Sequence, residues 1–515
     1  MSVYRQELSP VHFIERSGSV HAERVAVVDG DCTYTYGEWL KRSRRLASAL
    51  RRSGLRKGDR IAFLALNSEP LLLAHFAVPQ AGGVLVAINT RLNADEVGYI
   101  LRHSGSATVF YSAELEDQLS AAPDIRRIEI GRDFEDFLRS GDEAPVEPWL
   151  EDEYDTIAID YTSGTTGRPK GVMYHHRGAY LNAMAMTIEN RLSPDSACLW
   201  TLPMFHCNGW SHTWALVAAG AKNVCIRRID PPEVWRLLES EGITHFNAAP
   251  TVLIMLANDP SAGRLSHRVR VCTGGAPPSP TLIAQMEDLN VELVHLYGLT
   301  ESYGPFTINL PQPQLARMRA EEQARFKARQ GVTHIAAGRQ RVVDEEMRDV
   351  PADAETMGEL VLQGNVLMKG YFEDGAATEE AFRGGWFHTG DVGVIHADGY
   401  VELRDRKKDI IISGGENIST IEVEQAVASH PAVLECAVVA IPDPKWGEVP
   451  KAYVTLKPGH EADAGGIIEH VRGRIAHFKA PKQVEFGELP KTSTGKIQKY
   501  VLREREWAGR TRRVN

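Results

Sequence analysis

The chain lacks the features of secreted and membrane-spanning proteins. Its 515 residues include only six cysteines, scattered with no CxxC pair, so their spacing fits neither a zinc site nor a disulfide framework. The longest apolar stretch, residues 71–79, is interrupted by His75 and is far shorter than the roughly 20 residues that cross a bilayer. The opening segment, MSVYRQELSP, has no apolar core of a signal peptide. We therefore expect no membrane span, no secretory signal and a reduced, cytoplasmic setting.

Basic charge is also scarce. Lys and Arg number 58 against 68 Asp and Glu, which gives a formal net charge of −10. A nucleic-acid-binding protein needs a basic face, so we expect no nucleic-acid partner, and any anionic ligand must be held by local donors. Hydrophobic residues make up 43% and charged residues 24%, as in folded globular proteins. This length predicts two to four folding units.

Up to about residue 400, the pattern indicates an α/β fold. Strand-like apolar runs alternate with amphipathic stretches, as in open α/β sheets. The sequence contains no G-x-S-x-G, no HExxH and no GxGxxG after a strand, so hydrolase, zinc-protease and Rossmann dehydrogenase functions lack support. The predicted elements are strands at 24–28 and 60–66, a helix at 38–52, a loop at 142–155 and a charged helix at 312–330 that Gly331 closes.

The character of the chain changes near residue 405. The charge run 405–409 separates two apolar strands, and Ser419 with Glu422 forms a capping-box pattern at the start of a helix. Strands at 434–441 and 451–456 and a helix at 466–477 complete a small α+β domain. We predict a large domain over 1–404, a hinge over 405–409 and a mobile domain over 410–515. The charge run alone fits a solvated loop equally well.

The segment Tyr161–Val172, YTSGTTGRPKGV, predicts a phosphate-binding loop. Three glycines, four hydroxyl residues and one lysine lie between Thr162 and Val172, directly after an apolar stretch. Glycines let backbone N–H groups approach an oxyanion, hydroxyls add donors and the lysine adds charge. Gly171 follows Lys170 where a Walker A loop has Ser or Thr, which disfavours a P-loop kinase or ATPase. A merely flexible loop is the alternative.

Further glycine-containing polar segments follow along the chain. Each alone is typical of a turn, but the set in this order is distinctive: TGGAP (273–277), YGLTES (297–302), TGD (389–391), SGGEN (413–417) and TSTGK (492–496). With these motifs the chain, from about Phe13 to Arg503, resembles the adenylate-forming superfamily of acyl-CoA synthetases, aryl-CoA ligases, luciferases and nonribosomal peptide adenylation domains. The runs FHCNGW (205–210), GGAPP (274–278) and GWFHTGDVG (385–393) resemble short- and medium-chain acyl-CoA ligases in particular.

The resemblance implies a fold and a set of ATP contacts. The fold would combine a large N-terminal domain of mixed α/β sheets and a distorted β-barrel with a small mobile α+β C-terminal domain. Thr300 would bind the α-phosphate, Glu301 would coordinate Mg²⁺, and Lys496 would bridge the acid carboxylate and the α-phosphate. Other nucleotide contacts would come from Thr162, Ser163, Gly164, Thr165, Thr166, Gly167 and Lys170 at the phosphates, from Gly275, Ala276, Pro277, Tyr297 and Gly298 at adenine, and from Asp391 and Arg406 at the ribose.

The resemblance also implies sites for the acid and for coenzyme A. His206 would lie beside the acid, in a pocket formed by Phe205, Trp210, Trp214, Asn247 and Tyr303. Trp210 and Trp214, spaced i, i+4, would share a helical face and shorten the pocket, unless both only fill the core. Lys408 would be the hinge residue; Gly414, Gly415 and Glu416 would line the pantetheine tunnel, with Trp446–Glu448 nearby.

The expected reaction is ATP-dependent activation of a small or medium carboxylic acid to acyl-AMP with release of pyrophosphate, followed by transfer to coenzyme A. His206 replaces the aspartate that an α-amino acid substrate would need, so that substrate is disfavoured. Two alternatives remain: an adenylating ligase that passes the acid, or an oxyanion such as nitrite, to a non-CoA acceptor, and a non-catalytic homologue. Retention of Lys170, Glu301, Asp391, Arg406 and Lys496 argues against the latter. A homodimer is a further expectation.

Overall fold

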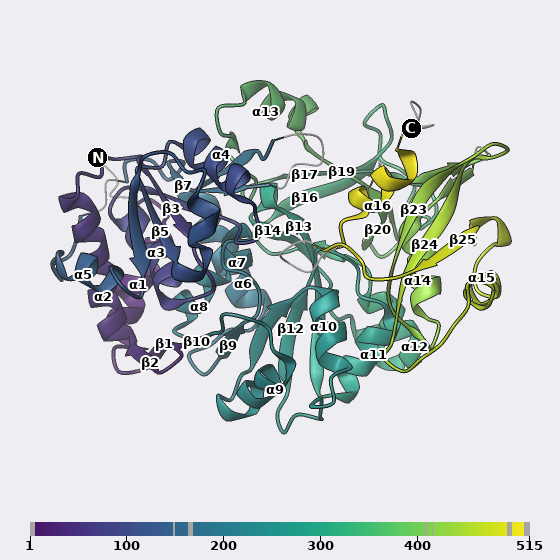
Figure 1. Ribbon diagram of the computed structural model, residues 1–515, viewed down its shortest axis with the longest axis horizontal. Coiled ribbons are helices and arrows are strands. Elements are labelled where there is room, and N and C mark those ends of the chain that lie inside the picture. Colours follow the sequence, from purple (N-terminus) through teal and green to yellow (C-terminus); the bar gives the residue numbers. More distant parts are fainter. Residues whose placement is uncertain are drawn as a thin grey trace.

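The computed structural model describes residues 6–147, 150–162, 168–406, 409–414, 416–491 and 497–508. Within these residues the chain forms mixed α/β layers in a large N-terminal domain and a smaller C-terminal domain at the opposite end from the N-terminus (Figure 1). The predicted fold class is confirmed.

The first sheet of the N-terminal domain has the order β18-β8-β7-β4-β3-β5-β6. Its central strands are parallel and nearly continuously apolar, as strands covered on both faces require. The strands are β3 (Arg60–Leu64), β4 (Val84–Ala87), β5 (Thr108–Ser112), β6 (Arg126–Ile130), β7 (Thr156–Tyr161), β8 (Gly171–His175) and β18 (Gly370–Tyr371).

The second sheet has the order β15-β14-β13-β12-β11-β9-β10-β1-β2. Parallel pairing through β13 brings the ends of β11, β12 and β13 to one edge, where several of the predicted motifs follow. The strands are β1 (Val25–Asp29), β2 (Cys32–Thr35), β9 (Ala197–Trp200), β10 (Lys222–Cys225), β11 (His245–Ala248), β12 (Val269–Thr273), β13 (Val291–Leu299), β14 (Gly304–Ile308) and β15 (Val332–Thr333).

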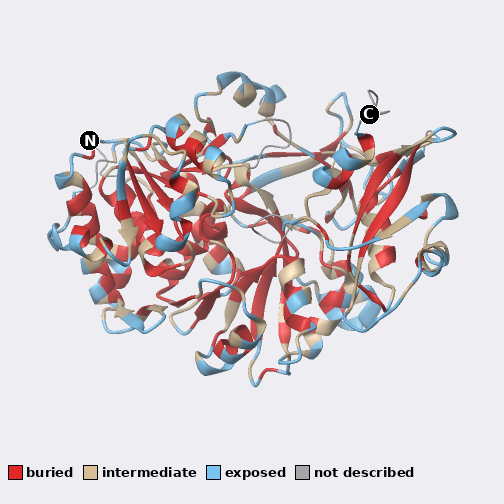
Figure 2. Ribbon diagram, in the orientation of Figure 1, coloured by how far each residue is buried: buried red, intermediate tan, exposed pale blue. Residues whose placement is uncertain are grey.

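Helices pack against these sheets, and the buried residues concentrate in the strands between them (Figure 2). The α-helices of the N-terminal domain are α1 (Val11–Val20), α2 (Tyr36–Arg52), α3 (Glu69–Gln80), α4 (Ala94–Ser104), α5 (Phe134–Arg139), α6 (His176–Glu189), α7 (Cys207–Trp210), α8 (His212–Ala219), α9 (Pro231–Ser240), α10 (Pro250–Ala257), α11 (Pro280–Asp288), α12 (Ala320–Lys327) and α13 (Gly375–Ala381). Short 3₁₀ turns are η1 (Ala113–Leu119), η2 (Thr300–Ser302), η3 (Pro313–Arg317) and η4 (Arg383–Gly385).

An antiparallel sheet of order β16-β17-β19-β20 leads to the C-terminal domain. An isolated bridge between Gly331 and Val401 connects β20 to the segment before β15. The strands are β16 (Gly338–Val343), β17 (Gly358–Gly364), β19 (Phe387–Ile395) and β20 (Val401–Arg406).

The C-terminal domain has its own sheet and core. Ser419 accepts a hydrogen bond from the backbone N–H of Glu422, so the predicted capping residue does start the first helix. Ile411, Val423, Val438 and Val454 are among the apolar residues buried in this core. The elements are β21 (Ile411–Ser413), β22 (Glu416–Ile418), α14 (Thr420–Ala428), β23 (Val433–Asp443), β24 (Gly447–Leu456), α15 (Ala464–Arg472), η5 (His477–Lys479), β25 (Gln483–Phe486) and α16 (Lys499–Trp507).

The predicted helix over 312–330 is wrong in extent. The chain forms η3 and then α12, because the backbone is extended at Met318 and Arg319. Glu322 accepts a hydrogen bond from the Arg319 N–H at 3.0 Å and caps a separate helix. Gly331 lies beyond α12 with φ at 90°, and there it bridges Val401 rather than closing a helix.

Candidate active site

The predicted phosphate loop connects two antiparallel strands. Tyr161 at the end of β7 pairs with Gly171 at the start of β8, and the N–H of Thr162 donates to the carbonyl of Lys170 at 3.0 Å. The loop is therefore the turn of a hairpin whose base is fixed by the first sheet. Ser163, Gly164, Thr165, Thr166 and Gly167, at its tip, lie outside the described residues.

Two predicted nucleotide contacts, Tyr297 and Arg406, converge on a third, the carboxylate of Asp391. Asp391 in β19 lies opposite Arg406 in β20, and the Arg406 Nε lies 3.4 Å from its Oδ1. The hydroxyl of Tyr297, in β13, donates to the Asp391 Oδ2 at 2.7 Å. Burial, and then the Asp391 charge, raises the pKa of Tyr297 well above its usual value, so this phenol remains a neutral donor. A carboxylate has about four acceptor positions, so Asp391 retains capacity for two ribose hydroxyls.

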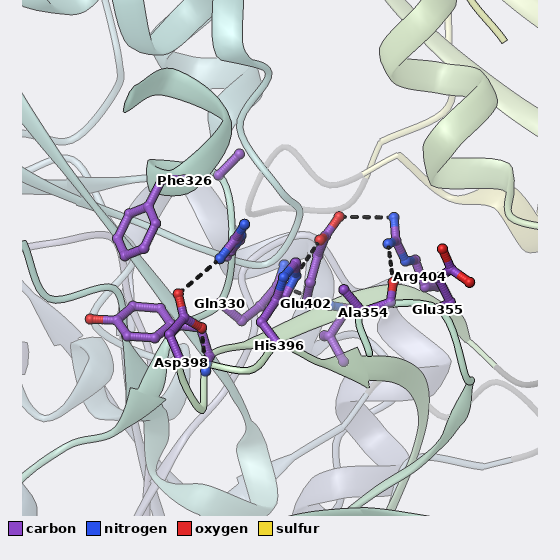
Figure 3. A network of polar contacts seen from close by, with 12 residues as sticks. Phe326, Gln330, Ala354, Glu355, His396, Asp398, Glu402 and Arg404 are labelled. Carbon is purple, nitrogen blue, oxygen red and sulfur yellow. Dashed lines mark hydrogen bonds and ion pairs between the residues drawn. The ribbon is translucent and has the colours of Figure 1, made fainter. Parts of the chain in front are cut away.

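A polar network holds the hairpin that carries Asp391 and Arg406 (Figure 3). Glu402 lies 2.8 Å from His396 across the hairpin and 2.9 Å from Arg404. Arg404 also donates to the Ala354 carbonyl at 3.1 Å, and Arg329 pairs with Asp398 at 3.2 Å. These contacts hold β20 and the β19–β20 turn against the segments around them.

The segments predicted near adenine follow β12 and β13. Gly274 lies against the carbonyl of Leu296 and the indole of Trp210, so close that a side chain there would clash. Gly275 has φ at 81°, a conformation that favours glycine, and it is exposed together with Ala276, next to Pro277. Gly298 lies at the irregular pairing of β13 with β14. The chain therefore turns sharply at the edge of the second sheet beside Tyr297.

Glu301 and Lys170 share a contact that the sequence did not indicate. The hydroxyl of Tyr371 donates to the Glu301 Oε1 at 2.8 Å, while the Lys170 Nζ lies 4.8 Å from the centre of the same ring. Burial raises the pKa of Glu301, and the hydrogen bond from Tyr371 and the positive charge of Arg406 oppose that rise. Tyr371 thus contacts both an acidic and a basic residue of the predicted site. Only its position after Gly370, in a glycine–aromatic pair, could have drawn attention to it.

Thr300 is tied to a left-handed turn that precedes α8. The Tyr174 hydroxyl donates to the Thr300 carbonyl at 2.6 Å, and the Cys207 Sγ lies 3.7 Å from the Thr300 Oγ1. Cys207 begins five consecutive residues with positive φ, between 48° and 62°: Cys207, Asn208, Gly209, Trp210 and Ser211. Left-handed backbone costs about 1–2 kcal/mol for each residue other than glycine, and such strain gathers at functional sites. His206, half-buried, immediately precedes this turn.

The left-handed turn changes the expected arrangement of the acid pocket. Trp210 lies in the turn and Trp214 in α8, so the expectation that they share one helical face is wrong. Trp214 is fully buried and donates to the His75 carbonyl at 3.1 Å. Tyr303 is fully buried, stacks on Tyr174 and accepts a hydrogen bond from the His175 N–H at 2.6 Å. Both make core contacts, and their role in a pocket, like those of the buried Phe205 and Asn247, stays a prediction.

The segments predicted to face coenzyme A lie side by side in the C-terminal sheet. Ser413 pairs with both Glu416 and Gly447, and the Gly414 N–H donates to the Trp446 carbonyl at 2.8 Å. Gly414 has φ at 61° and lies against the Trp446 ring, which is 44% exposed. Gly415, Lys408 and Lys496 lie outside the described residues. The hinge itself stays a prediction, although β20 extends to Arg406.

A divalent cation would have one protein carboxylate at this site. Among the described residues no group of three or more His, Cys, Asp or Glu side chains is arranged to hold a metal. Mg²⁺ usually binds through one or two carboxylates together with substrate phosphates and water. Glu301 has the hard carboxylate oxygens that this pattern requires.

The comparisons with known proteins identify the family. Residues 14–372 match the model of the AMP-binding enzyme family and residues 422–496 that of the AMP-binding enzyme C-terminal domain. The chain belongs to the AMP-binding enzyme family. This confirms the resemblance drawn from the sequence motifs.

Relatives match the chain over nearly its whole length. It is 43% identical to the acetate–CoA ligase CCL3 of Humulus lupulus and 42% identical to 4-hydroxybutyrate–CoA ligase 2 of Metallosphaera sedula, in both cases over 96% of this chain and 94% of the relative. Among solved structures, the anthranilate CoA ligase AuaEII in complex with anthranoyl-AMP matches with a TM-score of 0.88 and 26% identity, over 98% of both chains. ATP-bound MatB from Rhodopseudomonas palustris matches with a TM-score of 0.85 and 27% identity, over 96% of this chain and 98% of MatB.

The structure also bears on membranes and disulfides. Within the described part of the chain, no helix is both long and apolar enough to span a bilayer. All six cysteines are among the described residues, and all are free.

Proposed function

We propose that the protein is an AMP-forming ligase that activates a short or medium carboxylic acid with ATP and transfers it to coenzyme A. The observation that carries the proposal is the convergence of Tyr297 and Arg406 on Asp391, next to the Glu301–Tyr371–Lys170 group. Relatives named for acetate, butyrate and 4-hydroxybutyrate indicate the size of acid.

Each group has a defined part in this proposal. Asp391 accepts hydrogen bonds from the ribose, which fixes the nucleotide relative to Thr300 and the α-phosphate. Lys170 and Arg406 offset the repulsion between the acid carboxylate and the phosphates, an effect that preorganised charges supply without reorganisation. Glu301 would hold Mg²⁺, which supplies charge neutralisation at the phosphates when bound. Lys496 would stabilise charge at the α-phosphate during adenylation.

The second step would use the C-terminal sheet. Ser413, at the end of β21, pairs with Glu416 in β22 and with Gly447 in β24, so the predicted coenzyme-facing segments lie on neighbouring strands, with the half-exposed Trp446 ring against Gly414. Coenzyme A is the acceptor that this arrangement favours. We infer a reduced compartment such as the cytoplasm from the free cysteines, and the homodimer stays a prediction for size-exclusion chromatography to test.

The experiment that tests the proposal measures nucleotide products with a panel of short acids, with and without coenzyme A. We expect AMP and pyrophosphate with the preferred acid, and an acyl-CoA by mass spectrometry when the thiol is present. ADP as the nucleotide product would overturn the proposal, and AMP with no thioester would leave only the adenylation step.

A pair of variants on one hairpin tests the role of Asp391. Asp391→Asn removes the charge that pairs with Arg406, so we expect KM for ATP to rise roughly tenfold, the size of one charge-assisted hydrogen bond. Asp398→Asn, the matched control, removes a carboxylate seven positions along that pairs with Arg329 instead. Equal KM values in the two variants would contradict the assignment.

A further inference from the structure

The strand that carries Asp391 contains a bulge at this residue. Glu359 of β17 pairs with Val392 of β19, and the next pair along these two strands is Val361 with His388. Between the two pairs β17 contributes a single residue, whereas β19 contributes three, of which Asp391 is the last. Bulges are frequent beside active sites, because the extra residues change the direction of a side chain. The direction of the Asp391 carboxylate therefore depends on what holds the bulge.

The first residue of the bulge, Thr389, makes two hydrogen bonds with its side chain. Its hydroxyl donates to the Leu360 carbonyl at 2.6 Å, and its Oγ1 accepts from the Asp391 N–H at 3.1 Å. Gly390, the middle residue, has φ at 69°, a left-handed conformation that favours glycine and breaks the regular strand. The Gly390 N–H therefore takes its acceptor from a side chain instead of from the strand ladder.

That acceptor is Glu359, a residue that no sequence motif singled out. Its Oε1 accepts from the Gly390 N–H at 3.2 Å. Its Oε2 lies 3.2 Å from the His388 Nδ1 and 3.5 Å from a terminal nitrogen of Arg383. Only 14% of the Glu359 side chain is exposed. The carboxylate is thus fixed by two basic residues that precede the bulge, and a carboxylate forms stronger hydrogen bonds with N–H donors than a neutral oxygen does.

We propose that Glu359 is a positioning residue, which holds the bulge in the conformation in which Asp391 accepts hydrogen bonds from the ribose hydroxyls. Glu359 acts through the Gly390 peptide and not by contact with the nucleotide. Removing the carboxylate frees this peptide to rotate, and the adjoining Asp391 then loses its alignment with Tyr297 and Arg406. Glu359 therefore contributes to the recognition of ribose over deoxyribose. This inference rests on the proposed function, in which Asp391 binds the ribose.

The test compares ATP with 2′-deoxy-ATP and 3′-deoxy-ATP by pyrophosphate release at a saturating concentration of acid. We expect the wild type to prefer ATP over at least one analogue by roughly tenfold in kcat/KM, the size of one hydrogen bond to a charged group. Glu359→Ala should raise KM for ATP more than KM for that analogue, so that the preference falls towards one, while KM for the acid stays the same. Loss of folded protein alone would lower the turnover of all three nucleotides equally and leave the preference in place.

A conservative variant and a matched control accompany this substitution. Glu359→Gln keeps an oxygen acceptor for the Gly390 N–H in a side chain of nearly the same size, so it should retain the preference for ATP. Gln363→Ala is the control, because Gln363 lies four residues along β17 and donates to the Gly385 carbonyl at 3.1 Å, outside the bulge. Loss of that hydrogen bond should leave the preference unchanged.

A double variant shows whether Glu359 acts through Asp391. In an Asp391→Asn background the ribose contact is already weakened, so adding Glu359→Ala should lower kcat/KM for ATP less than it does in the wild type. If instead the two losses multiply, the two residues act independently and the inference is overturned.

Three further results would also overturn the inference. An unchanged preference for ATP in Glu359→Ala would mean that the Thr389 hydrogen bonds hold the bulge without Glu359. An equal loss of preference in Gln363→Ala would assign the effect to β17 as a whole. A wild type that uses all three nucleotides equally well would remove the ribose role of Asp391, and this inference with it. AMP and acyl-CoA formation in any of these cases leaves the proposed function standing, whereas no pyrophosphate with any acid would remove both.

Discussion

Tyr371 contacts two site residues of opposite charge with different parts of one side chain. Its hydroxyl donates to Glu301 and its ring lies under the Lys170 ammonium group. In its proposed role Glu301 would be ionised to hold Mg²⁺, and burial opposes that ionisation by raising its pKa. The Tyr371 hydroxyl therefore extends the pH range over which the carboxylate is charged.

Tyr371→Phe separates these two contacts, because phenylalanine keeps the ring and loses the hydroxyl. Without the hydrogen bond the pKa of Glu301 rises further, so activity is lost at a higher pH as the solution is acidified. We expect the acid limb of the pyrophosphate-release profile, measured from about pH 5 to about pH 8, to move upward and kcat to fall roughly tenfold. Tyr500→Phe, at a 38% exposed position, should leave the profile in place. If the acid limb of the Tyr371→Phe profile does not move, the Tyr371 hydroxyl does not control the ionisation of Glu301 in the reaction.

The sequence identified individual site residues within motifs, but it did not identify the contacts between those residues. Asp391, Arg406 and Tyr297 stand out because each lies beside glycines or charges in a recognisable segment, and the structure brings them together. Tyr371 lies 70 residues from Glu301 in the sequence, and no local pattern encodes that pairing. The Asp160–Asn208 bond spans 48 residues and is hidden in the same way.

Among the elements, the turn at Cys207–Ser211 departs most from expectation. The spacing of Trp210 and Trp214 predicts a right-handed helix, since apolar periodicity carries no information on the sign of φ. Asn208 and Gly209 are the local sign of the left-handed backbone, because Gly and Asn enter that region at low cost. β3, α2 and α14 were predicted to within a few residues, because β3 is a continuous apolar run and one-sided burial gives the two helices their apolar period.

Gly209→Ala tests whether the turn needs glycine for space as well as for conformation. A side chain at this position would lie 2.5 Å from the Trp200 ring, and φ is 62°. We expect the free energy of unfolding to fall by about 1–3 kcal/mol, the usual cost of overpacking a buried position. Gly263→Ala is the matched control, since nothing lies within 4 Å of its added carbon. Equal stability of both variants in denaturant titration would contradict the packing described for the turn.

For the whole molecule, the functional question is how two half-reactions share one site. The predicted hinge falls where β20 leaves the antiparallel sheet, and Asp409 on its far side pairs with Arg503 in α16. Lys408 and Lys496 lie outside the described residues, so their roles rest on the sequence motifs alone. Domain order and fold class were predictable from motif order, whereas domain rotation leaves no periodic signal in a sequence.

Two substitutions should separate the half-reactions. Lys496→Ala should abolish acid-dependent pyrophosphate release while thioester formation from supplied acyl-AMP continues, because only adenylation needs that charge. Lys408→Pro should do the reverse, because proline fixes φ and restricts rotation. Assays of both steps on both variants, with Lys482→Ala at an exposed position as a surface control, distinguish these outcomes. Parallel loss of both steps in Lys496→Ala would contradict its assignment to adenylation.

The connection between β20 and α14 limits where this enzyme can be joined to a relative to make a chimera. Asp405 pairs within the N-terminal sheet, yet its Oδ2 accepts from both the N–H and the hydroxyl of Thr420 at 2.7 Å, and the neighbouring Ser419 hydroxyl donates to the Arg404 carbonyl. If the junction between two parent sequences falls between these residues, the buried carboxylate of Asp405 and its partner Thr420 come from different parents, as do Arg404 and its partner Ser419. Chimeras should therefore inherit positions 404–405 and 419–420 from the same parent, whichever parent supplies the rest of the C-terminal domain.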